Sequence, residues 1–122
     1  MEMKEKIARL LKEVGVCPSN LGWRYLYDAL LMMTHDEELM YAGITAMYAI
    51  IGKRYGVSSF SVERSMRSEL GRLFEKMPED VKYEIFRNSV SGTTITNREF
   101  VGTLVQIIMT EPNNPIMKRI GA

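Results

Sequence analysis

Two arginines, Arg64 and Arg67, stand three residues apart in a segment otherwise rich in serine. The planar guanidinium group of arginine matches the O6 and N7 acceptors that guanine presents in the major groove of DNA. Side chains three residues apart on a helix point the same way, so the pair could address neighbouring bases. The pattern predicts that Arg64 and Arg67 contact bases of double-stranded DNA.

Further residues near this pair could hold the phosphate backbone. Lys53 and Arg54 lie shortly before it, and basic side chains there could contact phosphates. Small hydroxyl side chains allow a close approach and can also bond phosphates; they are Ser58, Ser59, Ser61, Ser65 and Ser68. Residues 52–72 hold five basic and two acidic side chains, a local charge of +3 against +1 for the whole chain. The positive charge is therefore concentrated around the two arginines.

The helix that must carry the arginines is amphipathic. At about 100° per residue, its apolar residues share one side: Val62, Met66, Leu70 and Leu73. Glu69 is the charged exception on that side, while Arg64 and Arg67 lie opposite it, with Phe60 at the edge of the polar face. One side can thus pack on a core while the other meets a ligand.

The junction before this helix predicts a helix-turn-helix. A preceding helix ends with Lys53 and Arg54, and Gly56 supplies the left-handed residue of a tight turn. Ser58 or Ser59 can cap the second helix. That helix extends to residue 74 or 76, before Pro78.

The rest of the chain also reads as helix. Apolar spacing and end signals predict helices over 5–14, 20–33, 39–51, 79–86 and 97–109. Gly43 is the expected break if the third of these divides in two, and Thr96 and Glu99 fit a capping box before the last. Residues 88–95 are polar and β-branched and read as a loop. The fold class is therefore all-α, with about six helices around a central helix-turn-helix. We expect residues 1–110 to form one domain and 111–122 a mobile C-terminal tail.

Composition excludes several classes of protein. With 122 residues, the chain can fold without a staple, and its one cysteine, Cys17, cannot form an internal disulfide. No apolar run reaches 18 residues, and residues 1–12 lack the apolar core of a signal peptide. We therefore expect a cytoplasmic protein without a membrane span, and we identify no cofactor, metal or catalytic site.

Several segments resemble one known family. Residues 59–70 (SFSVERSMRSEL) resemble the recognition-helix signature V-E-R-x-I-R of the sporulation initiation regulator, a phosphorelay response regulator. Residues 22–30 (GWRYLYDAL) resemble its G-x-x-Y-L-x-x-A-I segment, and residues 96–100 (TNREF) its T-N-S-E-F entry to the last helix. Residues 44–55 are similar to the first helix of its helix-turn-helix. The agreement is collinear over about residues 7–108.

This resemblance implies a six-helix effector domain that binds promoter DNA and regulates transcription. It implies that Arg64 and Arg67 read guanines in a short box. Its implied partners are RNA polymerase or a sigma factor, with possible self-association through the last helix (97–109) on tandem boxes. Ser61 and Ser68 stand where the family usually has arginine and histidine, and its usual proline is replaced near Ala49. The 122 residues leave no room for a receiver domain, so the sequence is either an excised domain or a freestanding relative.

Two other functions remain open from the sequence. A protein-interaction module could keep this fold without binding an operator, as the small net charge and the two serine replacements allow. An enzyme would need converging groups, and the candidates are residues 35–38 (HDEE) and a pairing of Cys17 with His35. Adjacent residues on a helix do not converge, and Cys17 is expected to be a buried structural residue. The acidic run instead suits the start of a helix.

Overall fold

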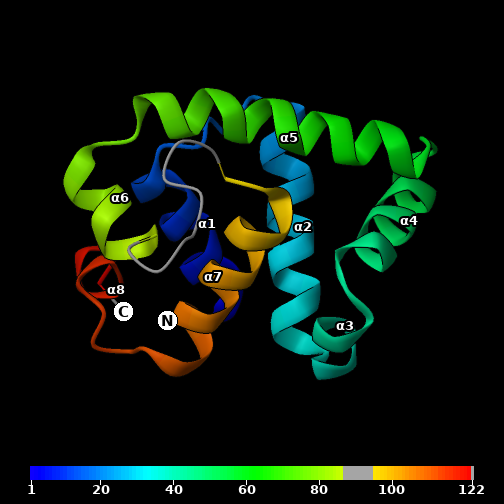
Figure 1. The fold of residues 1–122 in the computed structure, drawn as a ribbon. Coiled ribbons are helices and arrows are strands. Elements are labelled where there is room, and N and C mark those ends of the chain that lie inside the picture. The colour runs from blue at the N-terminus through cyan, green and yellow to red at the C-terminus, as the bar shows by residue number, and fades with distance from the viewer. Residues whose placement is uncertain (87–94, 122) are drawn as a thin grey trace.

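The computed structural model describes residues 1–86 and 95–121, and shows helices joined by short turns (Figure 1). Within these ranges there are eight helices and no strand: α1 (Met3–Val14), α2 (Leu21–His35), α3 (Glu37–Ala42), α4 (Ile44–Tyr55), α5 (Ser59–Lys76), α6 (Glu79–Phe86), α7 (Asn97–Thr110) and α8 (Pro115–Arg119). The all-α class is confirmed. The count exceeds the predicted six because Gly43 separates α3 from α4 and because α8 was not foreseen. The loop predicted for 88–95 lies, apart from Ile95, outside the described residues.

Helix ends follow the sequence signals closely. The Asp36 carboxylate accepts from the Glu38 amide at 3.0 Å and caps α3. At the start of α7 the Thr96 hydroxyl accepts from the Glu99 amide at 3.1 Å, and the Glu99 carboxylate accepts in return from the Thr96 amide. The predicted capping box is therefore confirmed.

The core gathers around α2 and α7. Each presents an apolar stripe at helical spacing, with Tyr25, Ala29 and Leu30 buried on α2 and Phe100 and Leu104 on α7. In Figure 1, α5 runs across the top of the molecule over α1, α2 and α7, and α4 descends from its N-terminal end. This arrangement leaves the upper side of α5 uncovered by another helix.

Part of the expected C-terminal tail, Pro115–Arg119, forms the helix α8. Pro112 and Pro115 indicated that the chain could not continue as helix, but proline is also favoured as the first residue of a new one. Pro115 has that role, after the Asn114 side chain has accepted from the Ile116 amide at 3.0 Å. Ile116 is fully buried, and the Arg9 guanidinium donates to the carbonyl of Ile120 at 3.0 Å. The segment thus closes the core beside α1 and α6.

No helix among the described residues combines the length and apolar character needed to cross a membrane.

Candidate nucleic-acid interface

The turn between α4 and α5 has the predicted helix-turn-helix geometry. Gly56 ends α4 in the left-handed region, at φ 69°, which favours glycine. The Val57 amide then donates to the carbonyl of Gly52 at 2.9 Å. Ser58 caps α5, its hydroxyl oxygen accepting from the Ser61 amide at 3.0 Å. The turn therefore fixes where α5 begins and which way it points.

A second glycine determines how tightly this turn closes. A Cβ atom on Gly52 would lie 2.6 Å from the carbonyl oxygen of Val57, well inside the contact distance of real side chains. The neighbouring atom is backbone, so no side-chain rotation can relieve the clash. The sequence predicted the turn residue Gly56 but not the role of Gly52. A glycine inside a helix does not show in the sequence which backbone atoms of another segment will lie against it.

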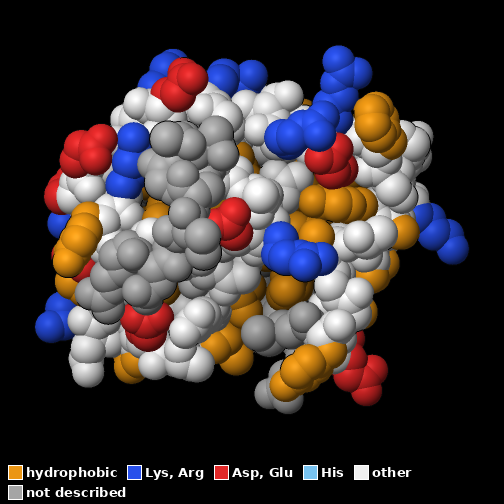
Figure 2. All heavy atoms as spheres, viewed as in Figure 1, with side chains coloured by type: hydrophobic (Ala, Val, Ile, Leu, Met, Phe, Trp, Pro, Cys, Tyr) orange, Lys and Arg blue, Asp and Glu red, His pale blue; other side chains and the backbone are white. Residues whose placement is uncertain are grey.

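The two arginines lie on the exposed face of α5. Opposite them the predicted apolar face is buried, at Val62, Met66, Leu70 and Leu73. Arg64 is exposed, and its guanidinium makes no ion pair with any residue in 1–86 or 95–121. The Arg67 side chain is 62% exposed. Figure 2 shows Lys and Arg side chains projecting along the upper margin of the molecule, where α5 runs.

Arg67 makes an ion pair with Glu63 on its own helix. The Arg67 Nη1 atom lies 3.0 Å from Oε1 of Glu63, one helical turn away. Exposed pairs at this spacing contribute about 0.3–0.5 kcal/mol. A bidentate contact to the right base is worth about 1–3 kcal/mol of discrimination. The ion pair therefore orients the guanidinium of Arg67 without preventing it from exchanging Glu63 for a base.

The predicted phosphate contacts fall into two groups. Lys53 is exposed and unpaired among the described residues, whereas Arg54 lies 3.3 Å from the Asp28 carboxylate. The five serines likewise differ in whether other residues already hold or cover their side chains. Ser59 and Ser68 are exposed, Ser58 and Ser61 hydrogen-bond to each other at the cap, and Ser65 is half-buried toward α2.

A buried carboxylate fixes α5 against α2. The side chain of Glu69, the charged exception on the apolar face, is only 4% exposed. It accepts from the Asn20 amide group at 3.0 and 3.2 Å and lies 2.7 Å from the Arg72 guanidinium. Next to it the helices approach so closely that a Cβ on Gly22 would lie 2.6 Å from Cβ of Glu69. Glu69 therefore fixes how closely α5 packs against α2.

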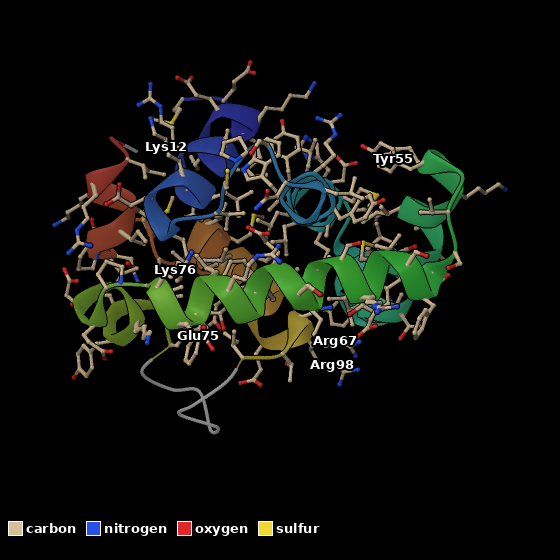
Figure 3. All side chains as sticks on the ribbon, turned by 90° about the horizontal axis from the view of Figure 1, so that it is seen from above. Lys12, Tyr55, Arg67, Glu75, Lys76 and Arg98 are labelled. Atoms are coloured by element: carbon tan, nitrogen blue, oxygen red, sulfur yellow. The ribbon has the colours of Figure 1, made fainter. Side chains whose placement is uncertain are left out.

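A second buried carboxylate, Asp28, ties α2 to the end of α4. The Tyr55 hydroxyl donates to Asp28, and the Arg24 guanidinium donates to that same hydroxyl at 2.8 Å. With Arg54 on the other side, the carboxylate has partners for its charge despite being buried. Figure 3 shows Tyr55 beside α4 at the N-terminal end of α5. The sequence did not reveal the contacts of Asp28 with Arg54 and Tyr55, which are 26 and 27 positions away. The local partner of Asp28 is Arg24, 3.9 Å away and four residues earlier on α2.

The start of α7 supports α5 from the other side. The Asn97 side-chain amide donates to the Tyr48 hydroxyl at 3.0 Å and to the carbonyl oxygen of Glu63 at 3.1 Å. Burial raises the pKa of Tyr48, which keeps this hydroxyl neutral. The residue after Asn97, Arg98, lines a cavity of about 510 Å³ together with Arg67. Figure 3 shows these two side chains near one another below α5. Arg98, which was not predicted from the sequence as a site residue, is thus a third arginine beside this face.

The structure gives no support to an enzyme built on Cys17 and His35. Cys17 precedes α2 and His35 ends it, so a helix of about 22 Å separates them. Cys17 is exposed, which corrects the expectation that it is buried, and its hydrogen bond with Ser19 lowers the pKa of its thiol. In the described part of the chain no three histidine, cysteine, aspartate or glutamate side chains are grouped to hold a metal ion.

Comparison with known families agrees with this geometry. The family described as "Sporulation initiation factor Spo0A C terminal" matches residues 7–108, most of the chain and all of α2 to α5. This family is a DNA-binding domain of a sporulation regulator and not an enzyme. The match includes the turn, the arginine face and both buried carboxylates. The chain therefore belongs to the family of Spo0A C-terminal DNA-binding domains.

Proposed function

We propose that this protein is a sequence-specific transcription regulator that reads guanine-containing boxes in duplex DNA with Arg64 and Arg67. The observation that carries the proposal is the position of both guanidinium groups on the exposed face of α5, the second helix of the helix-turn-helix. A DNA target would place the protein with the chromosome, in keeping with the cytoplasmic location expected from its sequence.

The proposed contacts follow from the dimensions of the groove. A major groove admits one α-helix, and base edges there distinguish all four base pairs. With its apolar side sealed against α2 and α7, α5 would enter with Arg64 and Arg67 toward the bases. Ser59, Ser68 and Lys53 lie exposed around that face and would contact the backbone, which fixes register without reading sequence.

The recognised sequence can be obtained directly by selecting bound duplexes from a random pool. The proposal expects enrichment of one short box with guanines at two or more positions, because each arginine has a guanine to address. Failure to enrich any sequence at low salt, together with capture of a protein partner, would favour the protein-interaction module instead.

Lys53→Ala is expected to weaken binding to every duplex alike. Removing one phosphate contact lowers the slope of log K against log salt by about 0.9 and leaves the preferred box unchanged. The matched control is Lys12→Ala, because Lys12 also occupies the last turn of its helix and is exposed. Anisotropy titrations at several salt concentrations give both slopes, and equal slopes for the two variants would exclude Lys53 from the interface.

Two protein partners follow from the family resemblance. RNA polymerase or a sigma factor is one, and a second copy of the chain, contacted through α7, is the other. The apolar side of α7 is buried, so self-association would use the residues it leaves exposed: Arg98, Gly102, Gln106, Met109 and Thr110. Comparing affinity for one box and for two boxes in tandem tests this contact.

A further inference from the structure

One large apolar side chain, Phe60, remains in solvent at the start of the recognition helix. It is 65% exposed, and none of the aromatic ring contacts among the described residues involves it. Single exposed apolar residues are common and need no special explanation. Phe60 differs from such residues in where it lies on α5.

Phe60 belongs to the same stripe as the two arginines, and not to the edge of the polar face where the sequence pattern placed it. Phe60, Arg64 and Arg67 are spaced at i, i+4 and i+7, which places them within about 60° of one another around the helix. Along the helix axis Phe60 precedes Arg64 by about 6 Å, close to two base steps of 3.4 Å. A helix that presents the arginines to bases therefore presents Phe60 to the same groove.

The first turn is also where recognition helices approach bases most closely. In helix-turn-helix proteins the N-terminal residues of the second helix contact base edges. Phe60 is the second residue of α5, and the small residues Ser59 and Ser61 flank it. Val57, in the turn, adds a further partly exposed apolar side chain. The leading end of the helix thus presents two exposed apolar side chains among small serines, while its next two turns carry the guanidinium groups.

The major groove offers one apolar feature to such a side chain, the C5-methyl group of thymine. We infer that Phe60 is a specificity-determining residue that packs against the methyl group of a thymine beside the guanines addressed by Arg64 and Arg67. This inference rests on the proposed function and extends it from hydrogen-bonded guanines to an apolar contact at a neighbouring position.

The inference can be tested by removing the methyl group alone. Replacing thymine by uracil at each position of the selected box leaves base pairing intact. For the unaltered protein we expect one position, within about three base pairs of a guanine, at which uracil weakens binding about fourfold. A fourfold change corresponds to about 0.8 kcal/mol, the free energy gained by burying one methylene-sized group. Phe60→Ala should bind the thymine box about as weakly as the unaltered protein binds the uracil box.

The decisive result is the loss of sensitivity in the variant: Phe60→Ala should no longer distinguish thymine from uracil at that position. Tyr83→Ala is the matched control, because Tyr83 is 66% exposed on α6 and should retain the full fourfold difference. Thermal unfolding of each variant checks that the fold is kept. If Phe60→Ala still distinguishes the two bases fourfold, Phe60 does not contact the methyl group, although the proposed function stands. If no duplex is bound specifically by the unaltered protein, the proposed function fails and the inference with it.

Discussion

Alanine at Arg64 or Arg67 is expected to abolish the preference for guanine at one box position each. The loss corresponds to about 1–3 kcal/mol, or roughly 5- to 150-fold in the ratio of affinities for the selected box and for a box with that G·C pair replaced by A·T. Arg64 should show the larger loss in absolute affinity, because Arg67 must first give up its ion pair with Glu63. Competition titrations with the two boxes measure both ratios.

A control separates base reading from the loss of a surface charge. Arg9 makes an ion pair with Glu5 at 2.7 Å with the same spacing on α1, and its side chain is 50% exposed. Arg9→Ala removes an equivalent charge and an equivalent pair far along the chain from α5. It also removes the hydrogen bond to the Ile120 carbonyl, so urea unfolding of this variant is measured alongside its DNA binding. It should leave the preference for guanine unchanged. An Arg64→Ala, Arg67→Ala double variant that keeps the preference of the unaltered protein would contradict the proposed readout.

Alanine at Gly52 is expected to destabilise the helix-turn-helix, although alanine is the better helix former. Its Cβ would lie 2.6 Å from the carbonyl oxygen of Val57, so the turn must move away from α4. Overpacking of this kind costs about 1–3 kcal/mol, and the gain in helix propensity of about 1 kcal/mol offsets part of it. Urea unfolding should therefore show a lower free energy of unfolding. DNA affinity should fall further than that loss explains, because the turn sets the direction of α5.

Gly102→Ala provides the comparison for this experiment. Gly102 lies inside α7, and a Cβ there meets nothing within 4 Å. The same substitution should raise the free energy of unfolding by up to about 1 kcal/mol, with affinity for a duplex carrying a single box unchanged. Equal effects of alanine at the two glycines would show that the close contact at Gly52 is not what shapes the turn.

Local sequence signals were sufficient to predict the second half of the helix-turn-helix. Gly56, the serine cap and the apolar spacing of α5 each depend on residues within one or two helical turns, so they can be read without knowing the fold. The buried face and the exposed arginines followed from the same periodicity. The capping box at Thr96 was predicted for the same reason.

Contacts between distant segments could not be predicted in this way. The hydrogen bonds from Tyr55 to Asp28 and from Asn97 to Glu63 join helices whose packing the sequence does not reveal. The close approach at Gly52 depends on where the chain returns after its turn. Glu69 gave a partial signal, since a carboxylate on an apolar face requires buried partners, but not which ones. Helix α8 was not predicted because a proline can mark both the end of one helix and the start of another.

The proposed function requires α5 to lie in the major groove with its arginines against guanine. Substituting 7-deazaguanine for each guanine of the selected box removes only the N7 acceptor that a bidentate arginine uses. We expect the unaltered protein to lose affinity at two positions, Arg64→Ala to be insensitive to the substitution at one of them, and Arg67→Ala to be insensitive at the other. Undiminished binding of the unaltered protein to every 7-deazaguanine box would contradict the proposed function.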